Sequence, residues 1–102
     1  MYRASDERDN EEHLEQLQEA ADRLDLGTEA RSRATDVFLS NLPDGDRSKR
    51  ATMAASLYVG ALVAGQQRSQ GSVADAVGVS RLSVQQNWKD LLEASGLDAP
   101  SW

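Results

Sequence analysis

Ser69-Gln-Gly-Ser-Val-Ala-Asp-Ala-Val-Gly-Val-Ser-Arg-Leu-Ser-Val-Gln-Gln-Asn-Trp88 is the stretch that predicts the fold most sharply. Ser69 and Ser80 are of the residue type that caps helix N-termini, and Gly78 between them can adopt the positive φ of a tight turn. Apolar side chains surround that turn, namely Val73, Val77, Val79 and Val84. The pattern predicts a short helix, a turn and a longer helix, a helix-turn-helix unit over about residues 69–95.

Three further helices are predicted before this unit, from apolar residues at three- and four-residue spacing. The first runs from Asp9 to Leu24 and is ended by Gly27, and the second runs to Leu42 with Thr28 as its N-cap. The third, about residues 47–64, is rich in alanine and has the densest apolar content, so we expect it at the centre.

These helices define the expected organisation. We expect an all-α fold with five helices in one domain over residues 9–96. Residues 1–8 are predicted to be a disordered lead and residues 97–102 a short tail.

Composition excludes several classes of function. The 102 residues include no cysteine, which excludes disulfides and thiolate metal sites, and a single histidine, which disfavours histidine-based metal sites and most acid–base catalysis. We therefore expect no enzyme activity, metal or cofactor. No apolar run reaches the roughly 18 residues of a membrane span, and no signal-peptide core is present, so we expect a cytoplasmic protein without a membrane partner.

Charge divides the chain into two halves. Residues 1–46 hold 13 acids and 5 bases, whereas residues 47–102 hold 4 acids and 6 bases. The most basic spot, Arg47, Lys49 and Arg50, begins a helix, where the helix dipole disfavours positive charge. This placement suggests a secondary phosphate contact, although a solubilising loop is the commoner alternative. The 10 Asp and 7 Glu against 2 Lys also suggest a halophilic source.

Three segments resemble a cyclin-like repeat of the family of archaeal transcription initiation factor B and eukaryotic general transcription factor IIB. The alanine-rich helix Arg50–Ala61 contains a tyrosine, Ser69-Gln70 stands for a Thr-Gln pair, and Leu82-Ser-Val-Gln85 stands for Val-Thr-Ile-Arg. The resemblance is clear over residues 47–95. It implies a five-helix cyclin-like fold, promoter DNA as a partner, and TATA-box-binding protein or another transcription protein as a second.

The resemblance also implies roles for residues of the helix-turn-helix, whose second helix would lie in the major groove. Leu82 and Gln85 would face bases, Ser83 and Gln70 would contact phosphate, and Arg68, Arg81 and Lys89 would add attraction without sequence preference. The candidate DNA-binding residues are Arg68, Gln70, Ser80, Arg81, Leu82, Ser83, Gln85, Gln86 and Lys89.

Two departures from the family pattern limit this transfer. Gln85 stands where the family has arginine, and glutamine pairs with adenine whereas arginine prefers guanine. The chain has one repeat and no cysteine for a zinc ribbon, so we expect a truncated member, with a homodimer as one way to supply two repeats. The alternative function is a protein-interaction module of the transcription machinery, in which the helix-turn-helix is purely structural.

Overall fold

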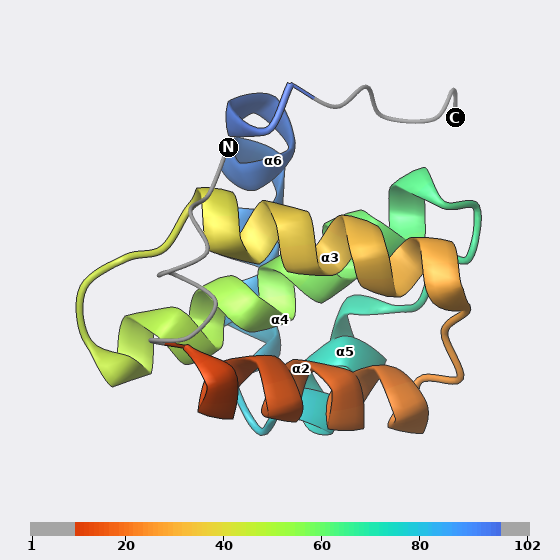
Figure 1. The fold of residues 1–102 in the computed structure, drawn as a ribbon, viewed down its shortest axis with the longest axis horizontal. Coiled ribbons are helices and arrows are strands. Elements are labelled where there is room, and N and C mark those ends of the chain that lie inside the picture. Colours follow the sequence, from red (N-terminus) through yellow and green to blue (C-terminus); the bar gives the residue numbers. More distant parts are fainter. Residues whose placement is uncertain (1–9, 97–102) are drawn as a thin grey trace.

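The computed structural model describes residues 10–96, and this part of the chain folds into five α-helices without a strand (Figure 1). In chain order they are α2 (Glu11–Arg23), α3 (Thr28–Ser40), α4 (Asp46–Val63), α5 (Gln70–Val77) and α6 (Arg81–Ala94). The predicted all-α, five-helix fold class is confirmed. The lead predicted at 1–8 and the tail predicted at 97–102 lie outside the described residues.

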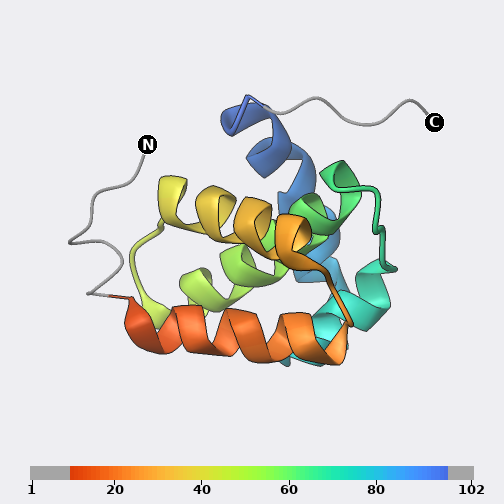
Figure 2. The same cartoon turned by 45° about the vertical axis from the view of Figure 1, so that its right-hand side comes forward.

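Helix α4 is the centre of the fold, as its composition predicted. It contacts each of the other four helices, and α3 lies along it in both views (Figures 1 and 2). Every residue from Met53 to Leu62 is buried, so α4 has neighbours on all sides. A Cβ atom at Gly60 would lie 2.6 Å from the backbone oxygen of Ala30 and 2.7 Å from the nitrogen of Ala34. Only a glycine therefore permits the observed approach of α3 to α4.

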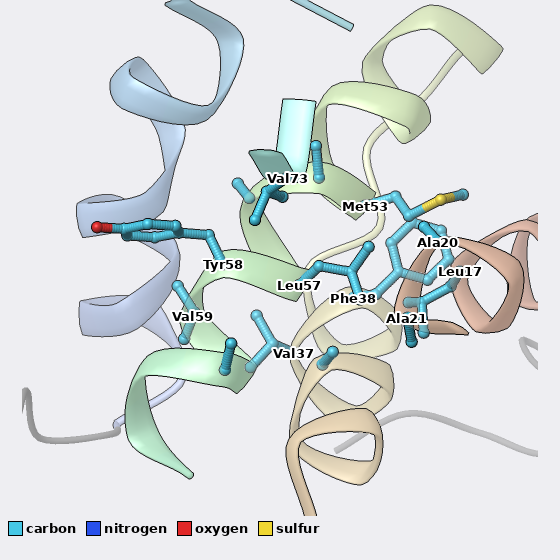
Figure 3. Close-up of a cluster of buried hydrophobic side chains, with 14 of the residues drawn as sticks. Leu17, Ala20, Ala21, Val37, Phe38, Met53, Leu57, Tyr58, Val59 and Val73 are labelled. Carbon is cyan, nitrogen blue, oxygen red and sulfur yellow. The ribbon is translucent and has the colours of Figure 1, made fainter. Parts of the chain in front are cut away.

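The core extends on both sides of α4 (Figure 3). Towards α2, Phe38 of α3 lies with Leu17 of α2 and Met53 of α4 in one buried cluster. Towards α6, the ring of Tyr58 meets the ring of Trp88 edge-on, with 5.2 Å between their centroids. Only 8% of Trp88 is exposed, so it is a core residue. This aromatic pair fixes α6 against the centre of the fold.

The connection between α2 and α3 differs from the prediction. Helix α2 ends at Arg23, and Asp25, not Gly27, adopts a positive φ of 54° after it. Aspartate tolerates this left-handed conformation better than most residues. The N–H of Leu26 then donates to the carbonyl of Ala21 (3.0 Å), which closes the turn and buries Leu26.

Gly27 instead begins the next helix, so the prediction of Thr28 as N-cap was also wrong. Gly27 is the N-cap of α3, in an extended conformation, and no side chain caps this end. The N–H of Gly27 donates to Oε1 of Gln66 at 2.8 Å, and a Cβ atom there would lie 3.1 Å from that oxygen. The close approach of the Gln66 side chain explains the glycine. Helix α3 ends at Ser40, two residues before the predicted Leu42.

Candidate nucleic-acid interface

Residues 69–95 form a compact pair of helices, here called the α5–α6 unit. Ser69 caps α5 by accepting the N–H of Ser72 (3.0 Å), and Ser80 caps α6 by accepting the N–H of Ser83 (3.2 Å). Gly78 between them has a φ of 86°. The N–H groups of Gly78 and Val79 both donate to the carbonyl of Ala74, at 2.8 and 3.0 Å. The caps and the turn therefore have the geometry that the sequence predicts.

The turn of this unit is held from outside by Arg50 of α4. Its Nη2 donates to the carbonyl oxygens of Val77 (3.1 Å) and Gly78 (3.3 Å). The last carbonyls of a helix have no partner within the helix, and a guanidinium is a suitable donor for them. Arg50 thus joins the basic start of α4 to the turn before α6.

A surface pocket of about 340 Å³ lies at this junction. Its lining comes from the start of α4, the turn and the first turn of α6: Arg47, Arg50, Ala51, Gly78, Val79, Ser80 and Ser83. The first N–H groups of an α-helix have no helical acceptor and carry partial positive charge. The first turn of α6 contains no acidic residue. Two guanidinium groups and a helix N-terminus therefore create a positive, concave surface suited to an anion such as a phosphate.

The outer face of α6 continues from this pocket. Eight of its residues are exposed: Arg81, Leu82, Gln85, Gln86, Lys89, Asp90, Glu93 and Ala94. Leu82 is 55% exposed, and among residues 10–96 it is the exposed large hydrophobic side chain. Nζ of Lys89 lies 5.6 Å from the centroid of the Trp88 ring, within cation–π range. The exposed face of α6 thus carries positive, amide and apolar side chains, and its two acidic residues, Asp90 and Glu93, lie towards the C-terminal end of the helix.

Three of the candidate residues lie elsewhere. Arg68 donates to four backbone carbonyls, through Nε to Leu24 at 2.8 Å and through its other nitrogens to Asp25, Gln66 and Gln67. It fastens the loop before α5 to the end of α2. Nζ of Lys49 donates to Oδ1 of Asn10 at 2.9 Å, away from the pocket. Gln70 is the half-buried first residue of α5 and does not line the pocket.

The supporting role of Arg50 was not predicted from the sequence, which suggested a phosphate contact or a solubilising loop. A signal was present, because Arg50 lies three residues before Met53 and four before Ala54, on the buried face of the same helix. Arg23 has a similar role, since its Nη1 donates to the carbonyl of Ala76 at 2.8 Å. Arginines of two helices thus fasten the C-terminal end of α5.

No group of three histidine, cysteine, aspartate or glutamate residues between positions 10 and 96 is arranged to hold a metal ion. No helix within the same range is long and apolar enough to cross a membrane.

The family of the chain follows from comparison with known proteins. A family model described as the transcription factor TFIIB repeat matches residues 7–94. The chain belongs to this family. It is 32% identical over 84 residues to transcription initiation factor IIB of Pyrococcus horikoshii, a match covering 78% of this chain and 28% of the relative. Transcription initiation factor IIB 2 of Thermococcus kodakarensis is 27% identical over 90 residues, covering 85% of this chain and 29% of the relative.

Membership of the TFIIB repeat family confirms the resemblance read from the three sequence segments, including the cyclin-like fold. It also confirms that the chain is not an enzyme, because the family is one of transcription factors. The chain spans little more than a quarter of the curated relatives, since the match covers 28% of the Pyrococcus protein. The match extends further than residues 47–95, where the resemblance of the three segments is clearest, and includes α2 and α3.

Proposed function

We propose that this TFIIB repeat acts in transcription initiation and contacts promoter DNA with its α5–α6 unit. In this proposal α6 lies in the major groove as the recognition helix of a helix-turn-helix. Its N-terminal residues face the base edges, and the pocket at its start receives a backbone phosphate.

The observation that carries this proposal is the pocket between α4 and α6. It brings Arg47 and Arg50, far from the α5–α6 unit in sequence, to the start of the predicted recognition helix, beside Ser80 and Ser83. A protein that places a helix in the groove needs phosphate contacts beside that helix to fix its position. The positive pocket supplies such a contact, and the exposed face of α6 next to it is free to meet bases.

The phosphate contacts proposed here are a subset of those predicted from sequence. Arg47, Arg81 and Lys89 are exposed and close to the start or the outer face of α6. Arg68 and Lys49 are assigned structural roles instead, because backbone carbonyls and Asn10 already occupy their donors. The carboxylates of Asp90 and Glu93 weaken the field near the end of α6, so affinity depends more on Arg47 and Arg81 than on Lys89.

A protein partner is the second candidate function, and the charge of α2 favours it. Five acidic side chains of this helix are exposed, namely Glu11, Glu12, Glu15, Glu19 and Asp22. An acidic helix face complements a basic protein surface. We therefore propose TATA-box-binding protein as the first partner to test, and a second copy of this chain as the next.

The DNA proposal is tested by reversing one charge in the pocket and one outside it. Arg47 lines the pocket and Arg33 lies on α3, and both arginines are exposed. In fluorescence anisotropy with a labelled promoter-like duplex, Arg47→Glu is expected to weaken binding several-fold and to reduce the log–log salt slope by about 1. Arg33→Glu makes the same charge change and should have a much smaller effect. Equal losses for the two variants would contradict a contact at the pocket.

A further inference from the structure

We infer that α6 prefers A·T pairs, with Leu82 contacting a thymine methyl group and the amides of Gln85 and Gln86 pairing with adenine. This inference rests on the proposed function and adds the sequence class that the site would read. It uses the outer face of α6 and not the pocket, which binds phosphate whatever the sequence.

Leu82 supplies the first part of the argument. Leu82 is 55% exposed, so this large apolar side chain loses part of the free energy that burial would provide. It lies in the first turn of α6, beside the positive pocket. Residues of the first turns are the ones that face base edges when a recognition helix enters the major groove. The C5-methyl group of thymine is the apolar group that this groove displays, so it is the natural partner of Leu82.

The two glutamines supply the second part. Gln85 and Gln86 lie three and four residues after Leu82, which places them next to it on the exposed surface of the helix. Neither amide has a hydrogen bond to another residue within 10–96, whereas the amide of Asn87 donates to the carbonyl of Ser83 at 2.6 Å. Glutamine matches the N7 acceptor and N6 donor of adenine with both groups of its amide.

Residues that would read the other bases are placed less favourably. Carboxylates accept from the amino group of cytosine, but Asp90 and Glu93 lie towards the C-terminal end of α6. Arginine and lysine read guanine. Arg81 is the first residue of the helix and precedes Leu82 by one position, so it is turned by about 100° from Leu82 around the helix axis. Lys89 lies on the same side as Leu82 but two turns further along α6, where its Nζ is 5.6 Å from the centroid of the Trp88 ring. The face centred on Leu82 thus offers groups that match A·T pairs.

The inference is tested with duplexes of equal length whose central pairs are A·T, G·C, or A·U, the last lacking the thymine methyl group. Binding of the whole chain is measured by anisotropy at one fixed salt concentration. We expect about tenfold tighter binding to the A·T duplex than to the G·C duplex. Replacing thymine by uracil should weaken binding by about fourfold, the value of one buried methyl group.

Variants then assign these preferences to side chains. Leu82→Ala should bind the A·T and A·U duplexes equally, and its exposure means that folding is retained. The double variant Gln85→Ala with Gln86→Ala should lose most of the preference for A·T over G·C. Its matched control is Gln16→Ala with Gln18→Ala on α2, two exposed glutamines outside the interface, which should leave the preference unchanged.

The outcomes separate this inference from the proposal on which it rests. Failure to bind any of the three duplexes would overturn DNA contact itself. Equal binding to all three would leave DNA contact standing and overturn the preference for A·T. Tighter binding to the G·C duplex, as expected if Arg81 reads guanine, would overturn it as well.

Discussion

Arg50 of α4 donates through Nη2 to the carbonyl oxygen of Val77, 3.1 Å away, at the last residue of α5. This hydrogen bond connects two parts of the chain that the sequence presents separately, the basic start of α4 and the turn before α6. It holds the turn in place and leaves Arg47, one helical turn earlier, at the mouth of the pocket. Arg50 therefore contributes, together with the Tyr58–Trp88 contact, to the position of α6 relative to the positive charges.

Replacing Arg50 should therefore affect stability as well as DNA binding, whereas replacing Arg47 should affect binding alone. Arg50→Ala leaves two carbonyl groups without their charged donor, and we expect it to lower the free energy of unfolding by about 1–2 kcal/mol. Arg47→Ala, at an exposed position, should change it by less than about 0.5 kcal/mol. Urea unfolding of both variants measures this difference. Equal midpoints would show that the bonds of Arg50 to the turn contribute nothing to stability.

Replacing glycine by alanine should have opposite effects on stability at Gly60, where α3 approaches α4, and at Gly71 of α5. In Gly60→Ala the new methyl group would meet the backbone of Ala30 at 2.6 Å, so the helices must separate, at a cost of about 1–3 kcal/mol. Gly71→Ala in α5 meets nothing within 4 Å and should stabilise the chain by about 0.5–1 kcal/mol. Thermal unfolding distinguishes the two, and a tolerated Gly60→Ala would mean that α3 and α4 lie further apart.

Trp88 is expected to be essential for the attachment of α6. Trp88→Ala removes a side chain that is 8% exposed together with its edge contact to Tyr58, and should cost about 3–5 kcal/mol. The change in melting temperature measures this cost. A melting temperature close to that of the wild type would show that α6 does not need this side chain for packing.

Serine to alanine substitutions should also have opposite signs at two positions. The hydroxyl of Ser56 is fully buried and has no hydrogen-bond partner in the described part of the chain, so Ser56→Ala should stabilise by about 1 kcal/mol. Ser80 caps α6, and Ser80→Ala should destabilise by about 1 kcal/mol. Chemical denaturation of the two variants provides the comparison. A loss of stability in Ser56→Ala would indicate that its hydroxyl has a partner after all.

Much of the fold could be predicted because local chemistry determines it. The caps at Ser69 and Ser80 and the left-handed Gly78 need only their own neighbours, so residue type at the right spacing was sufficient. The α2–α3 connection was predicted wrongly because the role of its glycine is determined by a contact with a residue far away in the sequence. Gly27 approaches Gln66, 39 residues away, and Asp25 takes the left-handed conformation instead.

The candidate site was predicted in part, because local spacing determines which side chains of α6 are exposed but not which distant residues they lie beside. Exposure of Leu82 and Gln85 follows from the phase of one helix, with Val84 and Trp88 on its buried face. Whether a positive side chain is available depends on tertiary contacts. Arg68 reaches carbonyls at Leu24 and Asp25, and no local pattern in the loop around Arg68 reveals this. The pocket itself joins residues from two distant segments, which sequence spacing does not bring together.

The most direct test of DNA contact through the α5–α6 unit is a titration of isotope-labelled protein with promoter-like duplex DNA at two salt concentrations, followed by backbone amide shifts. We expect shifts at Arg47 and Arg50 and along residues 78–89, with affinity falling as salt rises. Unchanged spectra at both salt concentrations, or shifts confined to α2 and α3, would contradict DNA contact through the α5–α6 unit.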